Sequence, residues 1–242
     1  MRRVNVSIDD VTPHPHSSIR VVEKCFRILD RVPSAKFTLF VPTAYWRTIP
    51  SPPLSMCSTP LRLSENLDFC EQLAHLPQES FEIGFHGHHH GIPGKSNNDE
   101  LKSVSFDEAR RIYSLMMHEV VSAGMNDYFK MILRPPAWRL SKEAFDAADG
   151  VFDLLALNPD PAYESVYAGA QWSDRWKDRI VYQDTAPPIV PFPDTWEALE
   201  IVTHACEWDK NFLSNDLADS ICDLMSTSNA VGSFIGDLRG KV

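Results

Sequence analysis

The stretch Phe81-Glu82-Ile83-Gly84-Phe85-His86-Gly87-His88-His89-His90 places four of the chain's nine histidines directly after a short apolar segment. Glycines at positions 84, 87 and 91 argue against a helix, so we interpret residues 81–85 as a strand and the histidines as the loop that leaves it. His86 and His90 form an i, i+4 imidazole pair of the kind that zinc-type ions favour. A zincin would need glutamate as its base at position 87, so Gly87 excludes that mechanism and the base must lie elsewhere. The structural alternative is a solvated polar loop.

Short apolar runs alternate with amphipathic stretches on both sides of this segment, the pattern of βα units around a parallel sheet or barrel. Several runs are nearly all apolar, as expected of strands that are covered on both faces. The sequence therefore predicts an α/β protein with about seven parallel strands. These strands are Val4–Ile8, Lys36–Val41, Phe81–Phe85, Met131–Leu133, Phe152–Leu157, Arg179–Tyr182 and Glu200–Thr203.

Three helices are predicted between and after these strands. One begins at Ser105, with Glu108 completing a capping box, and ends at Gly124. The other two are Ser18–Leu29 and Asn215–Met225, each with an apolar face. Two proline-rich stretches, residues 49–60 and 187–193, are expected to be loops, and neither is typical of a domain linker.

The overall composition excludes several classes of protein. A length of 242 residues fits one catalytic domain over residues 1–242, and 43% hydrophobic with 23% charged residues is ordinary globular usage. The formal net charge of -10 would repel a phosphate backbone, so no nucleic-acid partner is expected. The oligomeric state is not indicated.

Cysteines and hydropathy give an expectation for the compartment. The five cysteines form no CxxC pair and no zinc-finger spacing, so we interpret them as reduced thiols. The sequence contains neither a secretory apolar region after its first residues nor an apolar run of 18 residues. A cytoplasmic protein that does not enter a membrane is therefore expected.

Asp9-Asp10 ends the first predicted strand. Successive side chains of an extended segment point in opposite directions, so the two carboxylates can hold different roles. One can bind a cation while the other accepts a proton from the water that the cation activates. A turn-forming aspartate pair is the structural alternative.

Polar residues also follow two other predicted strands. Arg134, stiffened by Pro135-Pro136, can pair with a carboxylate and keep it ionised near a metal, although a surface arginine is an equal alternative. His204 follows the last predicted strand, where a structural histidine is the more ordinary interpretation. Because the carboxyl ends of barrel strands share one face, which is where such barrels place active sites, we expect these side chains to converge.

These segments resemble the motifs of the polysaccharide deacetylase family, which includes chitin and peptidoglycan N-deacetylases, in the family's order from residue 9 to residue 204. Ser7-Ile8-Asp9-Asp10 resembles the Thr-Phe-Asp-Asp motif, implying that Asp9 is the general base and Asp10 a metal ligand. His86 and His90 match the two ligand histidines of the histidine-rich motif. Arg134-Pro135-Pro136 resembles the arginine motif that braces the base, and Val202-Thr203-His204 resembles the late Leu-x-His motif, whose histidine is the general acid.

The chain departs from the family pattern at three places. Val11 stands where the family usually has glycine, and the loop from Thr12 to His16 that follows can shape a different pocket. Gly87 replaces the serine or threonine that usually supports the histidine loop, so support must come from elsewhere. The tryptophan-bearing motif between Arg134 and His204 has only a weak candidate, Gln171-Trp172-Ser173-Asp174.

The resemblance implies a distorted (β/α) barrel and a metal-dependent deacetylase that removes an acetyl group from an N-acetylated, or O-acetylated, carbohydrate or sugar conjugate. The implied cofactor is one divalent ion, with zinc preferred, and the implied partner is a small-molecule or oligosaccharide substrate. Trp138 is a candidate for lining the acetyl or sugar pocket, with plain packing as the alternative.

Three rival interpretations remain at this point. The same metal site can hydrolyse a non-sugar amide or a cyclic ureide. A non-catalytic carbohydrate-binding relative is a second alternative, but it would need none of Asp9, Arg134 and His204. The third is a structural barrel with solvated histidines, which would bind no metal.

Overall fold

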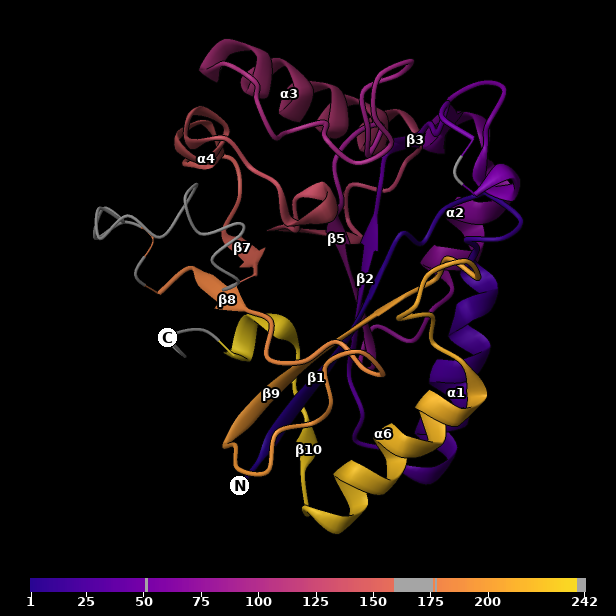
Figure 1. Cartoon of the computed structure of the whole chain (residues 1–242), viewed down its shortest axis with the longest axis vertical. Coiled ribbons are helices and arrows are strands. Elements are labelled where there is room, and N and C mark those ends of the chain that lie inside the picture. The colour runs from indigo at the N-terminus through magenta and orange to yellow at the C-terminus, as the bar shows by residue number, and fades with distance from the viewer. Residues whose placement is uncertain (51, 159–175, 177, 239–242) are drawn as a thin grey trace.

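The apolar runs of the sequence form one sheet of parallel strands, in the order β9-β1-β2-β5-β6-β7-β8, with β10 beside the start of β1 (Figure 1). The computed structural model describes residues 1–50, 52–158, 176 and 178–238. All seven predicted strands are confirmed, with ends that differ by one or two residues. The strands are β1 (Arg3–Asp9), β2 (Phe37–Val41), β5 (Phe81–Phe85), β6 (Phe129–Leu133), β7 (Leu154–Leu157), β8 (Ile180–Tyr182), β9 (Ala198–His204) and the unexpected β10 (Val231–Gly232).

The sheet curls until its two edges meet. Just beyond β8, Thr185 forms a parallel bridge to Ile201 of β9, and the Val202 amide donates to the Thr185 carbonyl at 2.9 Å. The Asp184 and Thr185 amides add bonds to the Glu200 carbonyl, at 3.3 Å each, so a short irregular contact joins the two edges. The expected distorted (β/α) barrel is confirmed.

Alternation along the strands separates the inside of the barrel from its outside. In β1, Val4, Val6 and Ile8 point outward and pack in the main hydrophobic core. Asn5, Ser7 and Asp9 alternate with them, point inward and form hydrogen bonds across the interior. Apolar residues and the 3-10 helix η5 (Ile235–Leu238) pack in the amino-terminal part of the barrel, beside a buried polar chain in which Asn5 donates to Thr38 and Thr38 donates to Glu82. These apolar residues are Phe40, Ile132, Leu154, Ala156, Val181, Ala198, Ile235 and Leu238.

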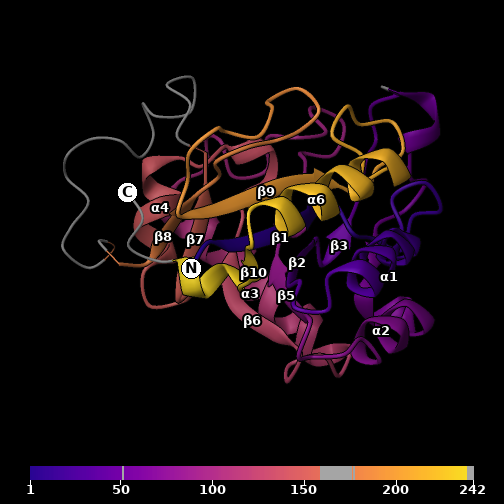
Figure 2. The ribbon, with the colours of Figure 1, turned by 90° about the horizontal axis from the view of Figure 1, so that it is seen from below.

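The helices cover the outside of the sheet. Figures 1 and 2 show α1 (Val22–Arg31) and α6 (Asn215–Thr227) side by side, and Arg27 bonds to Asp219 at 2.7 Å between them. The predicted start of α3 (Phe106–Ser122) is confirmed, because the Ser105 side chain accepts from the Glu108 amide, but the Glu108 carboxylate pairs with Arg111, so only the serine half of the expected capping box is formed. Two short helices were not predicted, α2 (Leu67–Ala74) and α4 (Lys142–Ala148).

The two proline-rich stretches are connections, as expected. The first lies between β3 (Ala44–Tyr45) and β4 (Leu61–Arg62), which pair as a small antiparallel hairpin, and its one regular element among the described residues is the 3-10 turn Pro53–Ser55. The second, residues 187–193, contains no helix or strand. Within the described part of the chain, no helix has both the length and the hydropathy needed to cross a membrane.

We expect Ile235→Ala to lower the free energy of unfolding by about 2–5 kcal/mol, because Ile235 is fully buried in the end of the barrel that η5 closes. Ile189→Ala is the matched control, since Ile189 is 57% exposed and its truncation should change stability by less than about 0.5 kcal/mol. Urea denaturation of both variants measures the difference. Equal small losses would show that η5 does not complete the core.

Candidate metal centre and active site

Parallel strands deliver the predicted site residues to one edge of the barrel. Asp9 and His204 are register partners at the ends of β1 and β9, whereas His86 follows β5 and Arg134 follows β6. A cavity of about 180 Å³ lies at this edge. Its lining includes Asp9, Asp10, His86, His90, Trp138 and His204, and Arg134 lies buried beneath them.

Asp10, His86 and His90 form a compact, buried set of three potential metal ligands. The Nε2 atoms of His86 and His90 lie 3.6 and 3.1 Å from Asp10 Oδ1. That oxygen is buried without a hydrogen-bond partner among the described residues. Two imidazoles and a carboxylate are a ligand set found in catalytic zinc sites.

The hydrogen bonds of the two imidazoles determine which nitrogen faces the centre. His86 Nδ1 donates to the Arg134 carbonyl at 2.9 Å, and His90 Nδ1 donates to the Asn97 carbonyl at 2.7 Å. Burial lowers the pKa of His90 to about 4, so this ring is neutral at pH 7 and its Nε2 carries a lone pair. A lone pair facing a carboxylate oxygen at this distance is favourable only with a cation between them, and the residues therefore fit a bound divalent ion.

The two aspartates are separated by backbone conformation as well as by alternation. Asp9 ends β1 and points into the barrel, but Asp10 is not extended: its φ is 59°, which turns its carboxylate toward the histidines. The Cys206 thiol donates to Asp10 Oδ2 at 3.0 Å, and the Ser17 hydroxyl donates to the Asp10 carbonyl at 2.6 Å. Burial raises the pKa of Cys206 well above its usual value, so the thiol stays protonated as a donor.

Arg134 is completely buried and holds Asp9 from below. Its Nη1 donates to Asp9 Oδ1 at 2.7 Å and to Ser7 Oγ at 2.8 Å, and its Nη2 donates to Glu200. The guanidinium lies between two aromatic rings, at 4.1 Å from the centroid of Phe40 and 4.6 Å from that of Trp138. Trp138 therefore both lines the cavity and packs on the arginine.

Glu200 is a member of this network that the sequence analysis missed. Its burial raises the carboxyl pKa above the usual value even beside Arg134. A signal was available, because Glu200 is an acidic residue in an apolar strand and shares the inward face with His204 four residues on.

His204 lies between two carboxylates. Its Nε2 is 4.0 Å from Asp9 Oδ2, and its Nδ1 is 3.4 Å from Asp209 Oδ1. Asp209 was also missed, since it stands on an irregular loop with no motif to indicate it. The weak tryptophan motif candidate, Gln171-Trp172-Ser173-Asp174, lies outside the described residues.

Support for the histidine loop comes from Glu100. Its buried carboxylate accepts the backbone amides of His88, His89 and His90, at 2.7, 2.6 and 3.3 Å. Gly87 has φ +80°, and a Cβ there would lie 2.3 Å from Glu100 Oε2. The missing serine or threonine is thus replaced by a glutamate from further along the chain, which needs glycine at position 87.

The remaining histidines near the site point elsewhere. His88 Nδ1 pairs with Thr43 Oγ1 at 2.8 Å, and His89 Nδ1 donates to the Ala44 carbonyl at 2.8 Å. In the loop after Asp10, His14 Nδ1 accepts the His16 amide at 3.2 Å. These rings hold loops together and are not members of the metal-ligand set.

Unusual backbone conformations gather at this edge. Of the non-glycine residues with positive φ in the described chain, four are Asp10, His90, Ala137 and Trp138, with φ of 59°, 70°, 47° and 64°. Each costs about 1–3 kcal/mol and persists only where the surroundings impose it. Such clustering is typical of functional sites.

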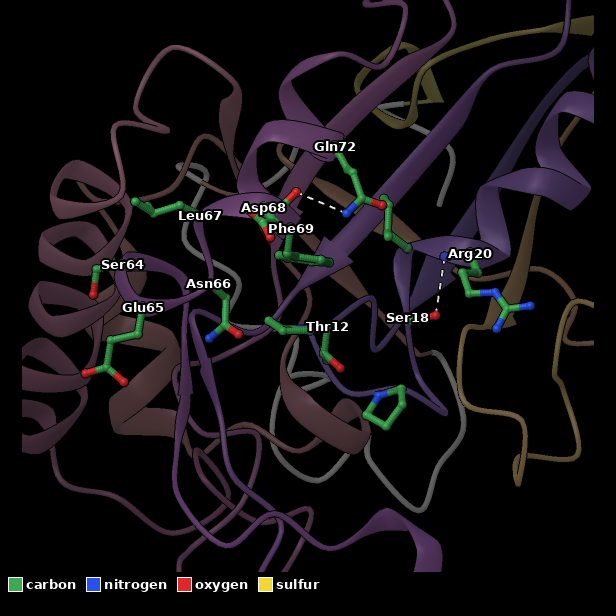
Figure 3. Close-up of a pocket in the computed structure, with 13 residues that line it drawn as sticks. Thr12, Ser18, Arg20, Ser64, Glu65, Asn66, Leu67, Asp68, Phe69 and Gln72 are labelled. Atoms are coloured by element: carbon green, nitrogen blue, oxygen red, sulfur yellow. Dashed lines mark hydrogen bonds between the residues drawn. The ribbon is translucent and has the colours of Figure 1, made fainter.

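A second, larger hollow of about 660 Å³ lies between the loop after β1 and the segment that leads into α2 (Figure 3). Among its lining residues there is no histidine or cysteine, and Glu65 and Asp68 are its acidic groups. Figure 3 shows that polar groups there bond to nearby backbone, as Gln72 does to the Asp68 carbonyl. This hollow has no set of metal ligands.

Comparison with known proteins identifies the fold. Neither a protein-family model nor a curated protein matches the chain. Among solved structures, the Bc1960 peptidoglycan N-acetylglucosamine deacetylase aligns with a TM-score of 0.57 at 15% identity, covering 98% of this chain and 87% of that one. The chain has the polysaccharide deacetylase fold.

Two further solved structures also match the fold of this chain. A family 4 carbohydrate esterase from Streptomyces lividans, in complex with acetate, gives a TM-score of 0.54 at 12% identity, covering 98% of this chain and 96% of that one. The chitin deacetylase of Colletotrichum lindemuthianum gives 0.54 at 13% identity, covering 99% and 88%. At these identities the likeness is one of fold, and function must be argued from the site.

We expect His86→Ala and His90→Ala to reduce bound metal from about one divalent ion per chain to a small fraction, because each removes one of three ligands. His118→Ala is the control, since His118 is exposed on α3 and should leave metal content unchanged. Elemental analysis after dialysis measures all three. Full metal content in both ligand variants would contradict the assignment of the centre.

Proposed function

We propose that the protein is a metal-dependent deacetylase that hydrolyses the acetamide of an N-acetylated sugar or sugar conjugate. The observation that carries the proposal is the Asp10, His86 and His90 set beside a second aspartate, Asp9, that is held by a buried arginine. The acetylated substrates named for proteins of the same fold support it. A cytoplasmic location, which the sequence predicts, would favour small soluble or nucleotide-linked sugars over a wall polymer.

We assign the cofactor as one divalent ion, zinc by preference, held by Asp10, His86 and His90. Zinc is suited to neutral imidazole and carboxylate ligands with one position left open. Such an ion lowers the pKa of water and polarises the acetyl oxygen, each of which lowers the barrier to attack on an amide.

Each remaining residue has one task in this mechanism. Asp9 accepts the proton of the attacking water, and Arg134 orients the Asp9 carboxylate through its 2.7 Å bond. His204 donates a proton to the departing nitrogen, and Asp209 on its other side stabilises the charged ring. Trp138 forms one wall of the cavity that receives the acetyl group.

The main alternative keeps this site and changes the substrate to a non-sugar amide or a cyclic ureide. Acetate release from a panel of acetylated sugars, with and without chelator, distinguishes the two. Chelator-sensitive acetate release supports the proposal. No release from any sugar, together with turnover of a simple amide or ureide, would replace it.

Asp9→Asn should retain metal but reduce kcat by about 10²–10⁴-fold, because it removes the base without removing a ligand. Asp10→Asn is the matched comparison, and it should weaken metal binding itself. Metal content and acetate release are measured on both variants. Equal metal loss in the two would contradict the division of roles between the adjacent aspartates.

His204→Ala should be slow by about 10²–10⁴-fold on an acetamide but nearly competent on an activated aryl acetate, because a good leaving group departs without a proton. Metal content should be unchanged, since His204 is not a ligand in this proposal. The ratio of kcat/KM values on the two substrates is the measurement. If both substrates lose the same factor, His204 acts on the oxyanion, the metal or the fold, and the general-acid role must be withdrawn.

A further inference from the structure

Arg47 is a second arginine at the cavity, and the proposed mechanism gives it no task. It lines the same cavity as Asp9 and His90 and is only 7% exposed. Among the described residues that line the cavity, Arg47 supplies the one permanent positive charge. Arg134, by contrast, lies beneath the floor with its charge directed to Asp9 and Glu200.

The backbone around Arg47 is tied to the metal-binding loop. The Ala44 and Trp46 amides donate to the carbonyls of His88 and His89, at 2.8 and 3.1 Å. On the other side, Asn97 holds Ile49 through both of its backbone groups, at 3.1 and 2.8 Å. The carbonyl of the same Asn97 fixes the His90 ring. Arg47 therefore keeps a constant position relative to the metal centre.

The guanidinium of Arg47 is also oriented. It lies over the ring of Trp208, 5.7 Å from the centroid, and Trp208 lines the cavity together with Asn98. A guanidinium carries its N–H groups in a planar fork that matches a carboxylate or phosphate. The backbone of the segment is pinned again at Arg47 itself, whose carbonyl accepts the Cys57 amide at 2.8 Å.

The carboxylates that line the cavity have other partners. Asp9 bonds to Arg134, Asp10 faces the two ligand histidines, and Asp209 faces His204. An anionic group on a substrate would be repelled by these three carboxylates unless it lay at Arg47. Arg47 is the position in the cavity where such a group is attracted.

We propose that Arg47 recognises an oxyanion group, carboxylate or phosphate, on the acetylated sugar, so that the enzyme prefers an anionic acetamido sugar to a neutral one. The inference rests on the proposed deacetylase function and names its substrate class. Arg47 then acts as a specificity-determining residue that places the acetyl group toward the metal centre. The cavity of about 180 Å³ is small, so we expect one acetylated sugar unit to occupy it.

The test compares three substrates on the zinc-loaded protein: N-acetylglucosamine, N-acetylglucosaminuronic acid and N-acetylglucosamine 6-phosphate. We expect kcat/KM for at least one anionic sugar to exceed that for the neutral sugar by about tenfold or more. The uronic acid and the phosphate ester distinguish the two sources of the oxyanion. Equal kcat/KM on all three substrates would overturn the inference while leaving the deacetylase function intact.

Variants of Arg47 assign the preference to this side chain. Arg47→Gln should reduce the anionic-to-neutral ratio of kcat/KM by about 10- to 100-fold, and Arg47→Lys should restore part of it by keeping the charge without the fork. Arg20→Gln is the matched control, because Arg20 is an exposed arginine outside the cavity and should leave the ratio unchanged. Metal content and melting temperature verify that the variants fold. An equal loss on neutral and anionic sugars in Arg47→Gln would contradict the assignment.

A binding measurement separates this inference from the deacetylase proposal. Calorimetric titration of zinc-loaded Asp9→Asn with the same three sugars requires no turnover. Tighter binding of an anionic sugar that Arg47→Gln abolishes supports the role of Arg47 even if the wild type releases no acetate, in which case only the deacetylase function fails. Equal dissociation constants for the neutral and the anionic sugars would overturn the proposed role of Arg47.

Discussion

The buried guanidinium of Arg134 is the interaction on which the site depends. Its side chain bonds to Asp9 and Glu200, and its backbone carbonyl accepts from the His86 ring. One residue thus fixes both the aspartate beside the metal centre and one of the metal ligands. A charge this deeply buried is tolerated only when opposite charges are paired with it, so removing the arginine would leave uncompensated carboxylates inside the barrel.

The barrel is built differently at its two ends because of this charge. The amino-terminal end holds an apolar cluster that includes Ile235 and Leu238, with a buried polar chain of Asn5, Thr38 and Glu82 beside it, whereas the arginine and its carboxylate partners lie toward the carboxyl end. Phe40 marks the boundary, since its ring belongs to the apolar cluster and also contacts the guanidinium. The apolar end supplies stability, which allows the other end to hold buried charges and strained backbone.

The metal centre and the substrate cavity are held by the same loops. Glu100 gathers the amides of the histidine loop, and Asn97 connects the His90 ring to the segment that carries Arg47. The proposed substrate-recognising Arg47 and the candidate metal ligand His90 therefore share one support. Geometry of this kind suits a site that must present a small acetylated molecule to the metal in a single orientation.

Much of this protein was determined by local sequence. Apolar runs separated by amphipathic stretches predicted the parallel strands, because strands that are covered on both faces must be apolar. The histidine-rich loop after Phe85 indicated a metal site, because imidazoles at i and i+4 are ligands that zinc-type ions favour. The helix start at Ser105 likewise depends only on neighbouring residues. Strand periodicity was also enough to suggest that Asp9 and Asp10 have different roles.

Only the tertiary structure showed which residues contact the candidate site residues. Glu100 and Asp209 join the site through contacts across loops that carry no local signal, and Arg47 enters the cavity because its segment pairs with the histidine loop. The turn at Asp10 depends on backbone strain imposed by its surroundings, which an extended-strand pattern cannot show. Periodicity specifies which way a strand side chain points, but the approach of two loops is set by packing over the whole barrel. That is why the sequence could indicate the candidate metal ligands, while the structure alone identified what surrounds them.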